Sequence, residues 1–183
     1  MFTSPQRPDE KLILGLINMA RRSFGDTMPE NDVREVLARK GTLFVAIDSK
    51  DEPVGFANTE YAKPIVHLSG GVVGPEHQGN GLYTLLTLTR LCNGISQGCY
   101  IVTTHTQNPV IEYTIANSLK MLVRSGDIRN FDLLHRLAPN RYGRMLTKAM
   151  PHSKDESINR MYGKLNYARG DAYELLFVTG VVR

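Results

Sequence analysis

The sequence predicts an α/β fold in which helices and strands form one layered sandwich. Three observations indicate this: helical periodicity near the start, consecutive strand-like segments in the middle, and an alternation of helix and strand afterwards. The chain has 183 residues, of which 42% are hydrophobic and 22% charged, as is ordinary for a soluble globular protein. We therefore expect residues 1–183 to form a single domain.

The first segments predict two helices. Apolar residues recur at near-helical spacing over about residues 9–24, after an acidic pair that suits a helix N-terminus. Pro29 then opens a second, shorter helix that reaches about Arg39 and ends at Gly41. These two helices precede every expected strand.

Three strands are expected next. Thr42–Asp48 and Val54–Tyr61 are rich in strand-forming residues and are separated by a polar turn, which predicts an antiparallel pair. Ile65–Val73 predicts the third strand. Its paired glycines, Gly70 and Gly71, indicate a bulge or a close approach of another backbone.

Helices and strands alternate in the second half. The expected elements are a helix, a strand, a helix and a closing strand, at Leu82–Leu91, Tyr100–Thr104, Pro109–Val123 and Ala172–Thr179. We expect Asn93 and Gly94 to stop the first of these helices. Residues 124–170 are expected to be an irregular, basic C-terminal segment with a short helix near Leu133, Leu134 and Leu137.

Positive charge is concentrated in the C-terminal third. Residues 120–170 hold eleven Lys or Arg against four Asp or Glu, whereas the whole chain has a net charge of only +4. Such a field raises the local concentration of anionic ligands, such as a nucleotide phosphate, a nucleic acid or an acidic protein segment. A solvated basic face without a ligand is the alternative.

The remaining composition narrows the class of protein. Cys92 and Cys99 form no CxxC pair and no metal-ligand pattern, so we expect free thiols and no metal. The short apolar run near the start has charges on both sides, which fits neither a secretion signal nor a membrane span. A cytoplasmic protein without membrane association is the expectation.

The turn from Gln78 to Tyr83 carries the clearest functional signal. Gly79 and Gly81 remove side chains just before a helix, whose first amides have no partner inside the helix. Phosphate groups bind such amides and gain from the helix dipole. No Gly-Lys-Ser, Gly-Lys-Thr or GxGxxG pattern is present, which argues against a nucleotide hydrolase or a dehydrogenase. A glycine-rich turn without a ligand is the alternative.

Residues Val72–Leu82, with the sequence Val-Val-Gly-Pro-Glu-His-Gln-Gly-Asn-Gly-Leu, resemble motif A of the GNAT superfamily of N-acetyltransferases. Gln78 and Gly81 match the first and fourth positions of the motif Arg/Gln-x-x-Gly-x-Gly/Ala. Tyr83 departs from it, because the family prefers Gly or Ala at this last position. The order of elements over about 9–123 and the closing strand are also similar, whereas the resemblance leaves 124–170 unexplained.

The resemblance implies a fold and a cosubstrate. The fold is a mixed, mostly antiparallel sheet flanked by helices, with the fourth and fifth strands splayed around acetyl-coenzyme A (acetyl-CoA). The expected cofactor-binding residues are Val72, Val73, Gln78, Gly79, Asn80, Gly81, Leu82, Tyr83 and Asn108. Val72 and Val73 would offer main-chain groups to the pantetheine arm. Asn108 also suits an N-cap of the helix that begins at Pro109, and the two roles are compatible.

The resemblance also suggests catalytic residues. An alkylamine is protonated at neutral pH, so its acetylation benefits from a general base. His67, eleven residues before Gln78, matches the position of a base in some members, and Glu60 on the preceding strand is the alternative. Tyr113 would protonate the departing thiolate, although its interval from Asn108 is shorter than usual. Packing roles remain open for His67 and Tyr113.

Together these residues predict an N-acetyltransferase that moves acetyl from acetyl-CoA to a primary amine by direct attack with general-base assistance. A catalytically silent CoA-binding or regulatory module is the alternative, because the expected phosphate site is mostly backbone. The amine is not identified; the basic residues Arg136, Arg141, Arg144 and Lys148 suggest an anionic macromolecule such as an acidic protein tail or an aminoacyl-tRNA. A homodimer is possible by analogy with similar proteins.

Overall fold

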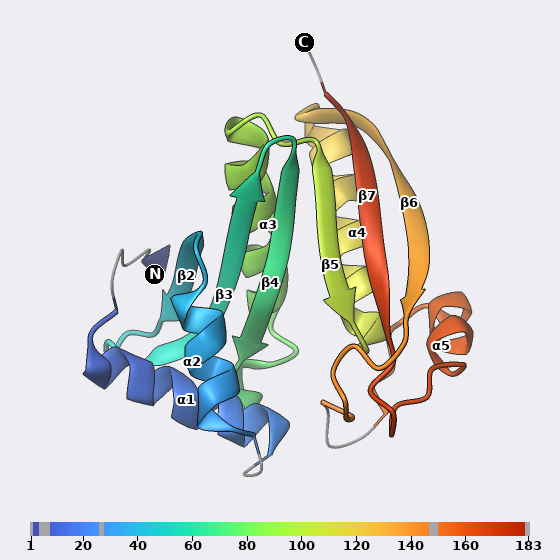
Figure 1. Ribbon diagram of the computed structural model, residues 1–183. Helices are drawn as coiled ribbons and strands as arrows, with labels where there is room; N and C mark the ends of the chain where they lie inside the picture. Colours follow the sequence, from blue (N-terminus) through green and yellow to red (C-terminus); the bar gives the residue numbers. More distant parts are fainter. Residues whose placement is uncertain (1, 4–7, 26–27, 147–149, 182–183) are drawn as a thin grey trace.

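The computed structural model describes residues 2–3, 8–25, 28–146 and 150–181. One seven-stranded sheet runs through them in the order β1-β2-β3-β4-β5-β7-β6 (Figure 1). The strands are β1 (Phe2–Thr3), β2 (Thr42–Ile47), β3 (Pro53–Ala62), β4 (Ile65–Val73), β5 (Ile101–Thr106), β6 (Ile128–Ala138) and β7 (Ala172–Val181). Of the strand pairs described, β4 with β5 is parallel and the others are antiparallel. The predicted mixed, mostly antiparallel sheet is confirmed.

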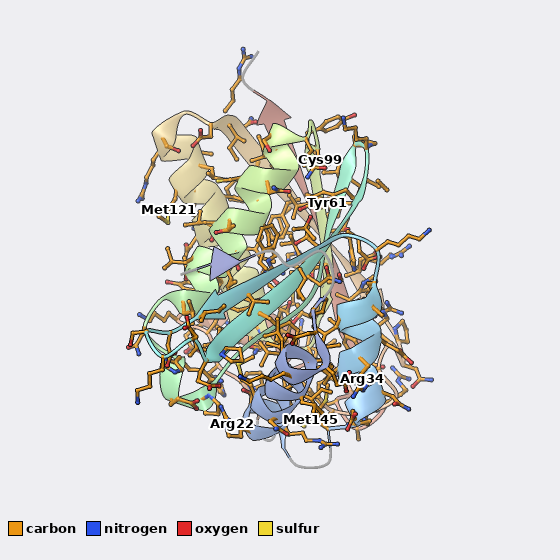
Figure 2. All side chains as sticks on the ribbon, turned by 90° about the vertical axis from the view of Figure 1, so that its left-hand side faces the viewer. Arg22, Arg34, Tyr61, Cys99, Met121 and Met145 are labelled. Atoms are coloured by element: carbon orange, nitrogen blue, oxygen red, sulfur yellow. The ribbon has the colours of Figure 1, made fainter. Side chains whose placement is uncertain are left out.

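Helices cover both faces of this sheet. They are α1 (Glu10–Phe24), α2 (Glu30–Ala38), α3 (Leu82–Ser96), α4 (Pro109–Ser125) and α5 (Glu156–Tyr162), with a 3₁₀ turn at Pro75–His77. In the view of Figure 2, α3 and α4 lie on one side of the sheet and α2 on the other. Figure 1 shows α5 beside the lower end of β6.

Two main apolar cores hold the layers together. Between α3, α4 and the sheet, buried residues from the helices meet β4, β5 and β7, notably Val66, Leu68, Leu91, Val102, Ile115, Leu119, Leu175 and Phe177. Between α1, α2 and the sheet, the buried residues include Leu16, Ile17, Val33, Leu37, Leu43, Val45, Phe56 and Val72. The strands of the central sheet therefore present apolar side chains to both faces, as buried strands do.

The sequence-based interpretation of residues 124–170 is wrong in part. Leu133, Leu134 and Leu137 belong to the eleven-residue strand β6, not to a helix, and the helix of this segment is α5. β6 is an edge strand: Leu133 packs on the core, while Leu134 is 62% exposed. Apolar residues on both faces hide the alternation that would have indicated a strand.

α3 is longer than expected. It runs through Asn93 and Gly94 to Ser96, and Gly94 is buried within it. A β carbon on Gly94 would lie 3.1 Å from the side chain of Val66 on β4. This glycine therefore permits close packing of the helix on the sheet instead of ending the helix.

Candidate active site

β4 contains the bulge that its paired glycines predict. The register against β3 shifts between Ala57 and Asn58 and leaves Gly70 without an opposite residue. Gly70 has a φ of +59°, and a β carbon there would lie 2.4 Å from Cγ1 of Val36 on α2. Only glycine fits this left-handed position under α2, so Gly70 allows the bulge to pack closely against the helix.

β4 and β5 separate after a short contact. Their parallel pairing covers Ile65–His67 against Ile101–Thr103. One step further, Thr104 Oγ1 donates a hydrogen bond of 2.8 Å to the carbonyl oxygen of Leu68. Beyond this bond the two strands diverge toward their carboxyl ends (Figure 1). The predicted splay of the fourth and fifth strands of the fold is therefore confirmed.

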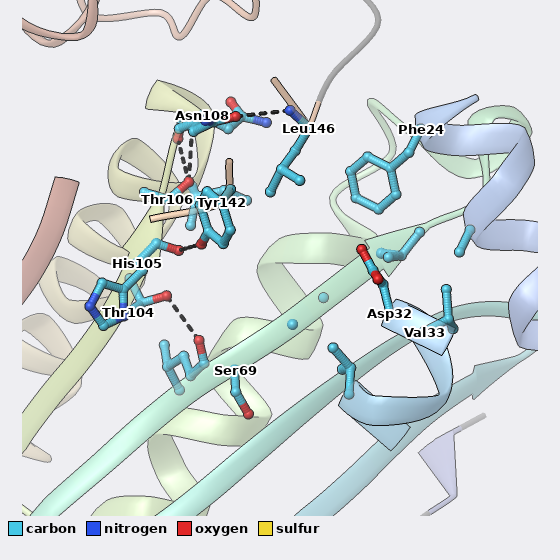
Figure 3. Close-up of a pocket in the computed structure, with 18 of the residues that line it drawn as sticks. Phe24, Asp32, Val33, Ser69, Thr104, His105, Thr106, Asn108, Tyr142 and Leu146 are labelled. Atoms are coloured by element: carbon cyan, nitrogen blue, oxygen red, sulfur yellow. Dashed lines mark hydrogen bonds between the residues drawn. The ribbon is translucent and has the colours of Figure 1, made fainter. Parts of the chain in front are cut away.

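A cleft of about 410 Å³ lies where the strands part. The residues around the β4 bulge line it, together with α1 and α2 on one side and the end of β5 on the other. Figure 3 shows Phe24, Asp32 and Val33 facing Thr106 and Tyr142 across the cavity. The cleft thus has walls from both halves of the sheet.

A segment between β6 and α5 crosses the mouth of the cleft. We call Asn140–Leu146 the strap. The hydroxyl of Tyr142 donates to the carbonyl of His105 at 2.8 Å, drawn in Figure 3. At the other wall, Arg144 forms an ion pair of 2.5 Å with Asp32 on α2. The strap therefore joins the end of β5 to α2.

His67 projects from β4 into this cleft. Its Nδ1 lies 2.9 Å from the hydroxyl of Thr103, and its ring centroid lies 5.7 Å from that of His105. Burial lowers the pKa of His67 below its usual 6.5; Glu60 opposes this shift, and nearby arginines add to it. The imidazole is consequently neutral at pH 7 and able to accept a proton.

Glu60 lies beside His67 on the neighbouring strand. The two residues are directly opposite in the β3–β4 ladder. The Glu60 carboxylate is 3.7 Å from the guanidinium of Arg39, which lines the cleft from the end of α2. Both base candidates from the sequence therefore lie close together, with Glu60 held in an ion pair and His67 facing the cleft.

The turn before α3 forms an open group of backbone amides. Gly79 and Gly81 both have a φ of +78°, and a β carbon on either would meet no atom within 4 Å. Gly81 is the N-cap of α3, which has neither a side-chain cap nor an acidic residue in its first turn. Amides in this arrangement bind an anion such as a phosphate, and the helix dipole adds to the attraction.

No protein-family model and no curated protein sequence matches this chain. Solved structures match it in three dimensions. The ribosomal-protein-S18-alanine N-acetyltransferase from Escherichia coli has a TM-score of 0.60 at 12% identity, over 100% of this chain and 96% of that one. The aminoglycoside 6'-N-acetyltransferase from Enterococcus faecium has a TM-score of 0.59 at 14% identity, over 100% of this chain and 98% of that one. A Bacillus subtilis acetyltransferase in complex with CoA has a TM-score of 0.56 at 14% identity, over 100% of this chain and 98% of that one.

The chain has the GNAT fold. The prediction that Val72 and Val73 offer main-chain groups to a pantetheine arm can be compared with the contacts at this end of β4. Val72 is buried in the core under α1 and α2. The carbonyl of Val73 already accepts two hydrogen bonds of 3.0 Å, from Ser23 Oγ and from Gln78 Nε2. A carbonyl oxygen has two lone pairs, so these two hydrogen bonds use the full acceptor capacity of the Val73 carbonyl. The side chain of Gln78 thereby fixes the end of β4.

Tyr83, the departure from the GNAT motif, points into the protein. Its ring would lie 3.0 Å from a β carbon on Gly71, and it packs with Leu82 on the core beneath α3. Arg90, which is 1% exposed, lies over this ring at 5.7 Å. The bulky side chain therefore fills space between α3 and the β4 bulge, while the exposed Asn80 and the two glycines keep the turn open to solvent.

Asn108 has the predicted N-cap position, while its role beside the cofactor stays a prediction. Its Oδ1 accepts a hydrogen bond of 2.9 Å from the amide of Val110, so it is the N-cap of α4. It also lines the cleft, near Thr106 and Leu146 in Figure 3. Tyr113 does not line the cleft: it lies on α4, and the structure does not bring it together with His67.

Three further cleft residues are absent from the sequence-based site. His105 is the last residue but one of β5, with its Nε2 3.7 Å from Glu174 and its buried Nδ1 without a hydrogen-bond partner among the described residues. Arg141 and Tyr142 come from the strap. No motif indicates these three residues, and the sequence singled out Arg141 only by its charge. The strap brings Arg141 and Tyr142 to the end of β5. The position of His105 directly after the expected strand Tyr100–Thr104 was the signal available for it.

Two negative findings complete the site. Within the described ranges, no group of three or more His, Cys, Asp or Glu side chains could hold a metal ion. None of the helices in that part of the chain has the length and apolar character that a membrane crossing needs. Cys92 is exposed and Cys99 buried, and both thiols are free.

Proposed function

We propose that this protein transfers acetyl from acetyl-CoA to a primary amine by direct attack of the amine. The observation that carries this proposal is the separation of β4 and β5 beside the uncapped N-terminus of α3. The parted strands leave a channel for an extended ligand, and the amides at Gly79 and Gly81 suit a pyrophosphate. A structural neighbour with this fold was solved in complex with CoA, which supports the choice of ligand.

His67 is the general base of the proposed reaction. Its neutral imidazole takes a proton from the attacking amine, directly or through a water molecule. The nitrogen then adds to the thioester carbonyl, and the C–S bond breaks as the amide forms. The thiolate that leaves takes up a proton, so the overall reaction transfers acetyl and releases CoA as a thiol. Among the residues that line the cleft, Tyr142 is the candidate donor of that proton, once its hydroxyl turns from the carbonyl of His105.

Thiol release with a panel of primary amines tests the proposal. We expect turnover in the native chain and a loss of about 10²–10⁴-fold in kcat for His67→Gln, the usual contribution of a general base. His152→Gln is the matched control, because His152 is exposed and does not line the cleft. Glu60→Gln tests the alternative base in the same assay.

The alternative, a catalytically silent CoA-binding module, leads to a different expectation. A catalytically silent module would bind CoA through the backbone of the turn, without release of thiol from acetyl-CoA. Calorimetric binding of CoA, measured on the same preparations, separates the two. Binding without turnover for any amine, unchanged by His67→Gln, would favour the silent module over the enzyme.

A further inference from the structure

Arg141 is a cation of the cleft that lacks a counter-ion. It lines the cleft from the strap, and it has no hydrogen bond or ion pair with any residue that the structure describes. The other basic residues singled out in this segment differ: Arg136 pairs with Glu174 and Arg144 with Asp32, whereas Lys148 lies outside the described residues. Of Arg136, Arg141 and Arg144, Arg141 is thus the one without an acidic partner among the described residues.

The backbone on both sides of Arg141 is fixed. The amide of Asn140 donates to Asp171 Oδ1, and the amide of Tyr142 donates to the carbonyl of Gly170, each at 3.0 Å. The bond from the Tyr142 hydroxyl to β5 holds the same stretch against the cleft wall. A ligand that binds the guanidinium consequently has to order only this side chain and not the loop beneath it.

Arg141 lines the same cleft as the candidate base. Its charge lowers the pKa of His67, after the larger effect of burial, and so does the charge of Arg39 on the opposite wall. Arg39 is 3.7 Å from Glu60, which neutralises it in part. An acceptor whose nitrogen lies at His67 therefore has an unpaired guanidinium within the same cleft.

We propose that the acceptor amine also carries an anionic group, a carboxylate or a phosphate, which Arg141 binds while the nitrogen lies at His67. The amine half of this statement rests on the proposed function. Arginine matches both groups because its planar guanidinium presents paired N–H donors to two oxygens. The same cation would repel a polycationic acceptor.

Binding measurements test the anion site without any need for turnover. Calorimetry or NMR titration of the CoA-bound protein would compare matched pairs of amines: β-alanine with propylamine, and O-phosphoethanolamine with ethanolamine. We expect the anionic member of a pair to bind at least about tenfold more tightly, as a charge-assisted hydrogen bond provides. Arg141→Gln should abolish this preference, and added salt should weaken it.

Arg129→Gln is the matched control, because Arg129 is an exposed arginine of β6 that does not line the cleft. It changes the net charge equally and should leave the preference intact. Equal affinities within both pairs in the native chain, or a preference that survives Arg141→Gln, would overturn the proposal. An Arg141-dependent preference without thiol release would uphold the anion site and refute the acetyl transfer.

Two further acceptors distinguish the source of the anion. A free amino acid presents its carboxylate alone, whereas a short peptide with a free N-terminus can present it as an Asp side chain at the second position. With thiol release as the readout, the better acceptor should lose its advantage in KM, not in kcat, on Arg141→Gln. An effect confined to kcat would contradict a role in binding.

Discussion

His67 is surrounded by charges of both signs. Glu60 and Glu174 raise its pKa, while Arg39 and Arg141 lower it, and burial decides the direction by lowering it most. The positions of these four groups come from α2, β3, the strap and β7, so the titration of one imidazole depends on four elements. The basicity of the candidate base is thus a property of the tertiary structure.

We expect the imidazole of His67 to titrate below pH 6.5, and an NMR titration of the ring protons measures this. The positive charge of Arg141 disfavours the charged imidazolium of His67, so Arg141→Gln should shift the midpoint of this titration to higher pH. Glu60→Gln should shift it to lower pH for the opposite reason. A midpoint in the native chain at or above 6.5 would contradict the burial of this residue.

Residues within a local motif were predictable from the sequence, and residues joined by topology were not. Gln78, Gly79 and Gly81 follow one another along one turn, and His67 lies at a fixed interval before them. His105, Arg141 and Tyr142 share the same cleft only because β5 ends there and the strap crosses it. Their roles depend on contacts between distant segments, which no short pattern encodes.

At the scale of elements, the helices with one buried face were predicted to within a few residues. The bounds of α1 and α4 agree with the apolar periodicity and with their N-caps, Asp9 and Asn108. β6 was missed because an edge strand need not alternate, and α3 was shortened because Gly94 signals close packing on β4 as readily as a helix end. Both errors arise where tertiary packing, not local preference, decides.

The turn before α3 allows a test with a matched glycine. Gly79→Ala places a β carbon on a residue with a φ of +78°, which strains the turn and misaligns its amides. We expect the Kd for CoA to rise about tenfold, equivalent to about 1.4 kcal/mol. Gly98→Ala has the same kind of backbone, with a φ of +82° and open space around it, at the far end of α3.

The two variants should lose similar stability, about 1–2 kcal/mol each in urea denaturation, since both force alanine into the left-handed region. Only Gly79→Ala should weaken CoA binding, as measured by calorimetry. Equal CoA affinity in both variants would show that the turn is a structural feature and not a phosphate site.

At the scale of the whole molecule, the position of β5 depends on β7. Phe177 of β7 is fully buried in the core beneath α4, whereas the next residue, Val178, is 36% exposed on the opposite face. We expect Phe177→Ala to lower the free energy of unfolding by about 3–5 kcal/mol. Val178→Ala should cost less than about 1 kcal/mol.

Urea denaturation of both variants measures these costs, and CoA binding under native conditions adds a second readout. Because β5 forms one wall of the cleft, loosening its neighbour should also weaken CoA binding in Phe177→Ala. Similar losses of stability in the two variants would contradict the burial of Phe177 in the core beneath α4.

The strand order has a further consequence for how the chain is made. β7 lies between β5 and β6, so β6 has no sheet partner among the described strands until β7 is present. β7 is also the last of these strands along the chain. During synthesis, β5, α4 and β6 therefore leave the ribosome before β7, the strand that pairs with both β5 and β6. Strands β1 to β4 can pair with one another as they emerge. β5 and β6 cannot be joined until residues 172–181 have been made, and until then their unpaired edges are open to association with other chains.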